Sequence, residues 1–244
     1  MNYKKHLISG NLKQFIIGGL FSFLLICTGF LWNRESKCDG FYPMKEGTVL
    51  KYKNSNNNNS STVKHKIKDV SGAGGKMKAT MHQVMKDEEG KVKNESDLNM
   101  ICEDGVIKVE SNMAKKMMGN SNSQGGTIKV SGDMKVFPNS MSVGDKLEDF
   151  ESKVTIDMGI KKMETKTRIY NRTVDKKEKI KTKAGKFSCY KITSDMKTDG
   201  MMGISNEGSL VKWVSKGVGL VKQKSLDKNG DVRSTMKLVE FKKP

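Results

Sequence analysis

The stretch STVKHKIKDV, residues 61–70, decides the fold class of this chain. Val63, His65 and Ile67 alternate in it with lysines at positions 64, 66 and 68. Because successive side chains of an extended backbone point to opposite faces, this pattern predicts a β-strand with one buried face and one wet face. Strands of that kind are typical of antiparallel sheets.

The same alternation recurs along the chain, in KMKATMHQVM (76–85), IKVSGDMKVF (128–137) and KVTIDM (153–158). Short polar stretches with glycine separate the apolar runs. They are DEEG (87–90), EDG (103–105), KAGK (183–186), KGVG (216–219) and DKNG (227–230). Glycine and asparagine supply the positive φ that tight hairpin turns need, so these stretches predict turns.

The predicted fold class is all-β and mainly antiparallel: a curved meander sheet or partly open barrel of about ten strands. One short helix is expected at the start of NMAKKMMGNSNSQGG (112–126), and a hydrophobic helix is expected before the sheet. The polar tract NSNNNNSS (54–61) is predicted to be an elongated hairpin loop. No βαβ alternation occurs, which disfavours a parallel sheet. Residues 38–244 are therefore predicted to form a single exported domain.

Residues 1–37 have the character of a targeting segment. Lysines at positions 4, 5 and 13 precede the apolar run FIIGGLFSFLLICTGFLW, residues 15–32. A basic flank before an apolar run is typical of a signal peptide or a single membrane anchor, and both stay open here. A lipoprotein signal at Cys27 is a third alternative, disfavoured because Ile26 is not a small residue. All three place residues 38–244 outside the cytoplasm.

The composition is strongly basic, with a formal charge of +18 from 45 Lys and Arg against 27 Asp and Glu. Residues 1–37 hold five positive and one negative side chain, so the exported part keeps +14. Aromatic residues are only 7% and do not interleave with the lysines, which disfavours nucleic acid as a partner. The partners expected are an apolar ligand or an anionic envelope surface, and the membrane itself if the N-terminal segment is not cleaved.

Three cysteines lie in the exported part, at positions 38, 102 and 189. They form no C-x-x-C and have no neighbouring histidine, so no metal site is expected. Cys38 leads into the first predicted strand, and Cys102 ends the fourth. In an antiparallel meander the leading segment can return to that strand end, so Cys38–Cys102 is the predicted disulfide. Cys189 lies in a predicted central strand and is expected to be a buried, inert thiol.

Three strings carry a family resemblance: CDGFYPMKEGTVLKYK (38–53), TKAGKFSCYKI (182–192) and WVSKGVGLVKQKSLDKNGDV (213–232). Together they resemble the TapB-like family of exported bacterial proteins, which is related to a broader envelope domain of unknown function. The resemblance implies a β-rich curved sheet and export. It implies no reaction and carries over no catalytic residues.

No catalytic constellation is recognisable in the sequence. His65 and His82 are the imidazoles available to act as a base, and alternation places them on opposite faces of the sheet. The chain contains no G-x-S-x-G, H-E-x-x-H or G-x-x-x-x-G-K-[ST] motif. We therefore expect no catalytic residues, no cofactor and no enzymatic activity.

Methionine is unusually frequent, at 17 of 244 residues. This flexible, polarizable side chain suits irregular cores and adaptable apolar surfaces. The favoured hypothesis is a non-enzymatic envelope domain with a binding or structural role. The alternative is a carrier or sensor of a lipid or other apolar ligand in a concave groove, and an envelope-associated hydrolase is a remote third. The expected lining of that groove is Val63, Ile67, Met77, Met81, Met85, Met113 and Met117.

Overall fold

A computed structural model describes residue 38 and residues 40–56, 59–109, 127–132, 134–135, 138, 140–157, 161–200 and 204–244. All of them belong to one compact unit, Glu35–Pro244. The hydrophobic segment 1–37 with Cys27, and the predicted short helix with Met113 and Met117, lie outside the described residues. Within the described part, no helix is long and apolar enough to cross a membrane.

The described residues form thirteen antiparallel strands in one open sheet, which confirms the predicted all-β fold class. Thirteen exceeds the expected ten because short strands such as β5 and β7 carry little periodic signal. The strands are β1 (Val49–Asn56), β2 (Ser60–Ala73), β3 (Lys76–Lys86), β4 (Val92–Glu103), β5 (Val106–Val109), β6 (Thr127–Ser131), β7 (Met134–Lys135), β8 (Phe150–Asp157), β9 (Lys162–Thr182), β10 (Gly185–Asp199), β11 (Ser205–Ser215), β12 (Gly219–Asp227) and β13 (Val232–Lys242).

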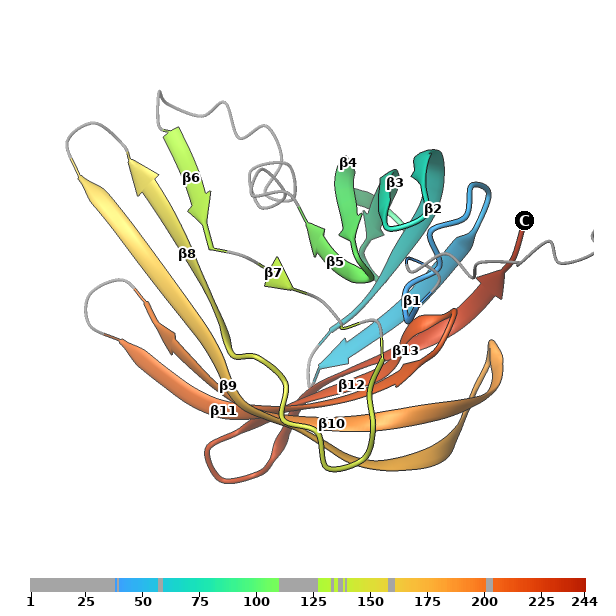
Figure 1. The fold of residues 1–244 in the computed structure, drawn as a ribbon. Helices are drawn as coiled ribbons and strands as arrows, with labels where there is room; N and C mark the ends of the chain where they lie inside the picture. The colour runs from blue at the N-terminus through green and yellow to red at the C-terminus, as the bar shows by residue number, and fades with distance from the viewer. Residues whose placement is uncertain are drawn as a thin grey trace, which may run out of the picture. The chain divides into compact units, whose positions relative to one another are not determined.

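Two meanders build the sheet, β1 to β5 and β8 to β13, and the pairing of β13 with β1 joins them. The first and last strands therefore lie in the middle of the sheet, where Leu50 pairs with Phe241 and Lys53 with Lys237. The sheet bends along its width, so that β4 and β5 stand opposite β6 and β8 (Figure 1). β1 ends at Asn56 and β2 begins at Ser60. The strands therefore extend into the asparagine tract, and the loop between them is shorter than the elongated loop predicted for residues 54–61.

The two edge strands, β6 and β7, follow each other directly in the chain. The prediction of one strand over residues 128–137 is wrong, because the chain turns at Gly132 and pairs with a different neighbour on each side. Gly132 has a φ of +111°, and a Cβ at this position would collide with the carbonyl oxygen of Glu151 in β8. Only glycine permits both this backbone conformation and this close approach. The turn brings the two sheet edges together.

One face of the sheet, here called the inward face, carries the main core. It includes Leu50 and Tyr52 of β1, Ile67 of β2, Met81 of β3 and Leu98 of β4. Their burial follows the alternation predicted from the sequence, most clearly in β2, where exposed lysines 66 and 68 flank the buried Ile67. Cys38 and residues 40–44, here called the covering segment, pack against this face, since Cys38, Tyr42 and Met44 belong to the same cluster. A second cluster surrounds Phe41 and contains Met141, Val174, Ile192 and Val214.

Candidate functional site

Five of the seven residues expected to line an apolar groove are described; they lie on the inward face, and most of them are covered. Ile67 is 0% exposed and Met81 4% exposed, and Val63 is also buried. Met77 packs at the margin of the core, and Met85 is half-buried. The hydroxyl group of Tyr42 donates to Met81 Sδ at 3.0 Å, so the covering segment occupies the space above β3. The structure thus places Val63, Ile67 and Met81 in the core instead of on an open surface.

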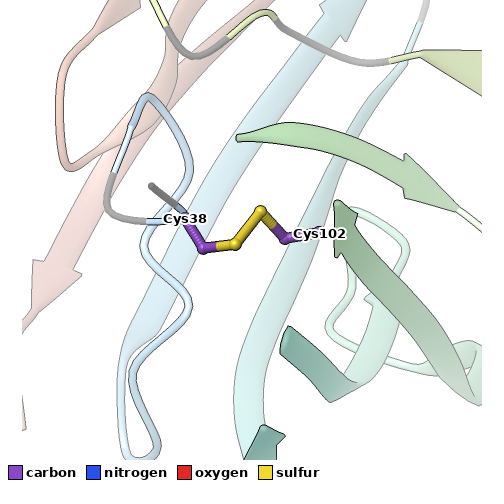
Figure 2. The surroundings of a disulfide bond; sticks show 2 residues. All are labelled: Cys38 and Cys102. Carbon is purple, nitrogen blue, oxygen red and sulfur yellow. A yellow bond between two sulfur atoms is a disulfide. The ribbon is translucent and has the colours of Figure 1, made fainter. Parts of the chain in front are cut away.

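A disulfide between Cys38 and Cys102 links the covering segment to β4 (Figure 2), with a Cα–Cα distance of 5.9 Å. These are the two cysteines whose pairing is predicted from the sequence. Cys189 is buried and free, and burial raises the pKa of its thiol to about 12, so it is inert at neutral pH. The bond links the start of the covering segment to the end of β4.

A row of polar side chains crosses the inward face beside the core. His65, Gln83 and Ser96 lie directly opposite one another on β2, β3 and β4. His65 Nε2 and Gln83 Oε1 are 3.0 Å apart. Within the described residues, His65 Nδ1, Gln83 Nε2 and Ser96 Oγ are buried without a hydrogen-bond partner. Unpaired buried polar atoms are rare and destabilising, so this polar row is the part of the inward face most suited to a polar group of a ligand or to ordered water.

Burial also determines the protonation of His65, whose pKa is lowered from 6.5 to about 4. Because the folded pKa lies below the unfolded one, the unfolded chain takes up the proton first as the pH falls. Stability that is present above pH 6.5 is therefore lost between about pH 6.5 and pH 4, by up to about 3 kcal/mol.

The measurement is urea unfolding of the wild type, His65→Gln and His82→Gln at pH 7.0 and pH 4.5. Between these two pH values the unfolding free energy of the wild type should fall. The fall should be much smaller in His65→Gln and undiminished in His82→Gln. An equal fall in all three proteins would show that other groups produce it.

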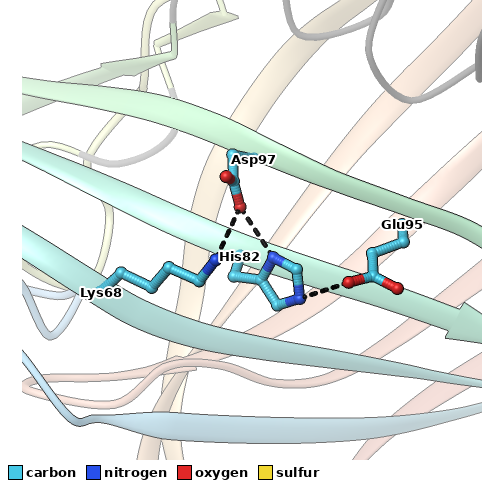
Figure 3. A network of polar contacts seen from close by, with 4 residues as sticks. All are labelled: Lys68, His82, Glu95 and Asp97. Atoms are coloured by element: carbon cyan, nitrogen blue, oxygen red, sulfur yellow. Dashed lines mark hydrogen bonds and ion pairs between the residues drawn. The ribbon is translucent and has the colours of Figure 1, made fainter.

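His82 lies on the opposite face of the sheet, in a network with charged neighbours (Figure 3). Its Nδ1 is 2.7 Å from Asp97 Oδ1 and its Nε2 is 3.1 Å from Glu95 Oε1. The hydrogen bond from His82 and the charge of Lys68 lower the pKa of the Asp97 carboxyl group. The two histidines are thus separated by the sheet, and each binds different partners. The strand alternation predicts this separation, whereas the contacts of His82 depend on the register of β3 and β4.

Two cations lie close together in the other half of the sheet. Arg172 is 6% exposed, donates through Nη1 to the Glu148 carbonyl oxygen at 2.6 Å, and lies over the Phe150 ring. Burial, together with the charge of Arg172, lowers the pKa of Lys212 to about 8. A positive charge at Lys212 is therefore held at neutral pH against a desolvation cost. Within the described residues, no group of three or more His, Cys, Asp or Glu side chains could hold a metal ion.

Sequence reasoning missed one surface feature, a cleft of about 730 Å³ between the tip of the β9–β10 hairpin and strands β13 and β1. Four lysines line it: Lys53, Lys181, Lys183 and Lys237. The available signal was the frequency of lysine on the wet faces of the strands. Which of these lysines meet depends on the pairing of β13 with β1, and the sequence pattern does not contain that pairing.

These features define a class of protein: a single curved antiparallel sheet, with a disulfide-held segment across its inward face. The sequence model of the DUF3108-like family matches residues 45–238, and the chain belongs to this family. Comparison with curated proteins found no match.

Two solved structures share the fold. One is a protein of Parabacteroides distasonis ATCC 8503 described as a candidate lipoprotein, with a TM-score of 0.66, 23% identity, and coverage of 84% of this chain and 99% of that one. The other is a protein of Bacteroides fragilis NCTC 9343 described as a candidate exported protein with a YmcC-like fold. It has a TM-score of 0.66 and 17% identity, over 84% of this chain and 100% of that one.

Proposed function

We propose that this chain is an exported, non-enzymatic binding domain of the bacterial cell envelope. The observation that carries the location is the Cys38–Cys102 disulfide, because such bonds persist in oxidising compartments and are rare in the cytosol. The basic flank and apolar run of residues 15–32 support export. The descriptions of the two structural neighbours agree with this location. We propose the narrower TapB-like assignment on the three strings that resemble that family.

Location and cysteine state test the proposal together. The full chain with a C-terminal tag is expressed in a bacterial host, fractionated, and alkylated under denaturing conditions without reductant. We expect a periplasmic or membrane fraction in which Cys38 and Cys102 are protected and Cys189 is alkylated. Recovery in the membrane fraction would favour a retained anchor at residues 15–32. A cytoplasmic protein with every cysteine alkylated would contradict the proposal.

The polar row on the inward face favours a second candidate function, the binding of an apolar ligand that has a polar end. His65, Gln83 and Ser96 would hold the polar end, and the half-buried Met85 lies on the neighbouring part of the same face. Mass spectrometry of the purified chain checks this proposal. A co-purified lipid that is lost in Gln83→Leu would support it. A preparation without lipid that also fails to bind a fluorescent acyl probe would reject it.

A further inference from the structure

The cleft beside the β9–β10 hairpin has a composition suited to anions. Besides its four lysines it is lined by three hydroxyl side chains, Ser55, Thr182 and Thr235, and by Leu238 and Val239. No carboxylate belongs to this lining. Lys181 and Lys183 come from the hairpin tip, whereas Lys53 and Lys237 come from the middle of the sheet. The tip is held near β13 by Phe187, whose ring lies 6.4 Å from that of Phe241.

The strand register concentrates positive charge at the floor of this cleft. Lys237 lies directly opposite Lys53 on β1 and directly opposite Lys222 on β12. Like charges directly opposite each other destabilise a sheet, and neighbouring strands are only about 4.8 Å apart. Burial, followed by the charges of Lys224 and Lys237, lowers the pKa of Lys222. A bound anion would relieve this repulsion.

Elsewhere on the sheet, several lysines are neutralised by carboxylates. Lys153 lies 2.8 Å from Glu164, Lys191 lies 2.6 Å from Asp175, and Lys197 lies 3.1 Å from Glu207. Across the described part of the chain, no ion pair involves any of the four cleft lysines. Lysines without an ion pair also occur elsewhere in the described part, such as Lys64 and Lys66. The cleft differs from those positions because it gathers four such lysines in one concave site.

We propose that this cleft binds a phosphorylated ligand that carries at least two negative charges, with Lys53 and Lys237 at its floor and Lys181 and Lys183 closing over it. Lysine is a compact charge with three donors that suits phosphate oxygens, and the hydroxyl groups of Ser55 and Thr235 add donors. A volume of about 730 Å³ is that of a small-molecule site. The inference rests on the proposed envelope function, because a free phosphorylated compound and a phospholipid headgroup are the two sources of this chemistry there.

Calorimetric titration with inorganic pyrophosphate tests the cleft, using the full chain in non-ionic detergent. We expect binding that weakens as salt is added and falls at least about tenfold in Lys53→Gln/Lys237→Gln. The matched control, Lys86→Gln/Lys91→Gln, removes the same charge from exposed positions at the β3–β4 hairpin and should bind like the wild type. Both double variants should unfold at the wild-type temperature or above it, because each removes only exposed lysines.

A second arm separates the two sources of phosphate. Vesicles of phosphatidylcholine, with and without phosphatidylglycerol, are sedimented with each protein. A loss of vesicle binding specific to Lys53→Gln/Lys237→Gln assigns the site to a lipid headgroup, and a loss confined to pyrophosphate assigns it to a free ligand. Equal losses in the control variant, or no binding to either probe, would overturn the inference. Neither result would change the compartment or the cysteine state, so failure of the cleft is distinguishable from failure of the proposed function.

Discussion

Reduction of the Cys38–Cys102 disulfide is expected to lower the free energy of unfolding by about 4 kcal/mol. The bond spans a sequence separation of 64, and in the chain-entropy model a loop of that length restricts the unfolded chain by about this amount. A loss of about 4 kcal/mol is a large part of the 5–15 kcal/mol that typically stabilises a domain. We therefore expect the reduced protein to unfold at a clearly lower urea concentration.

The measurement is urea unfolding with and without a phosphine reductant. Cys38→Ala/Cys102→Ala is the control, since its midpoint should already be low and should not respond to reductant. In the folded protein Cys189 does not exchange with the bond, because burial raises the pKa of its thiol to about 12. Since unfolding exposes this thiol, both proteins are measured with Cys189→Ala. An unchanged midpoint in the reduced wild type would show that the bond contributes little to stability.

The alternation of side chains was sufficient to predict the fold class and the faces of single strands. Ile67 is buried between the exposed Lys66 and Lys68, and Met81 is buried between the less buried Thr80 and His82, as period two requires. This pattern is local, so it carries no information on which strand neighbours which. The pairing of β13 with β1 joins the two ends of the domain and could not be read from it. The break at Gly132 was missed because the residues on its two sides keep the alternation.

The candidate sites show the same division between local and non-local information. The opposite faces of His65 and His82 follow from alternation, but the contact of His82 with Asp97 needs the register of two strands. The apolar groove was predicted from the strand faces alone. The covering segment that fills it could not be foreseen, because its sequence has no periodic pattern. The lysine cleft likewise exists only because the β9–β10 hairpin reaches β13. Surfaces made by distant strands are thus the part that sequence reasoning could not supply.

Replacement of Tyr42 by alanine is expected to cost about 3–5 kcal/mol, the range for deleting a large buried aromatic ring. The ring is 9% exposed and belongs to the main core cluster. Its edge lies against Gly219, where an added Cβ would come within 3.1 Å of Tyr42 Cδ2. Burial raises the pKa of the Tyr42 hydroxyl group, so it stays protonated and donates to Met81 Sδ. Tyr42→Phe removes only this hydrogen bond and should cost about 1 kcal/mol.

Comparison of Tyr42→Ala in oxidised and reduced protein shows what the disulfide does to the covering segment. If the bond acts only on the unfolded chain, the two losses of unfolding free energy add, as they do for independent sites. If reduction releases the segment, the Tyr42 ring leaves the core with Cys38, and Tyr42→Ala then costs little in the reduced protein. We expect additivity, because Phe41, Tyr42 and Met44 each bury apolar surface against the sheet without help from the bond. A cost in the reduced protein below about 1 kcal/mol would instead show that the disulfide alone keeps the inward face covered.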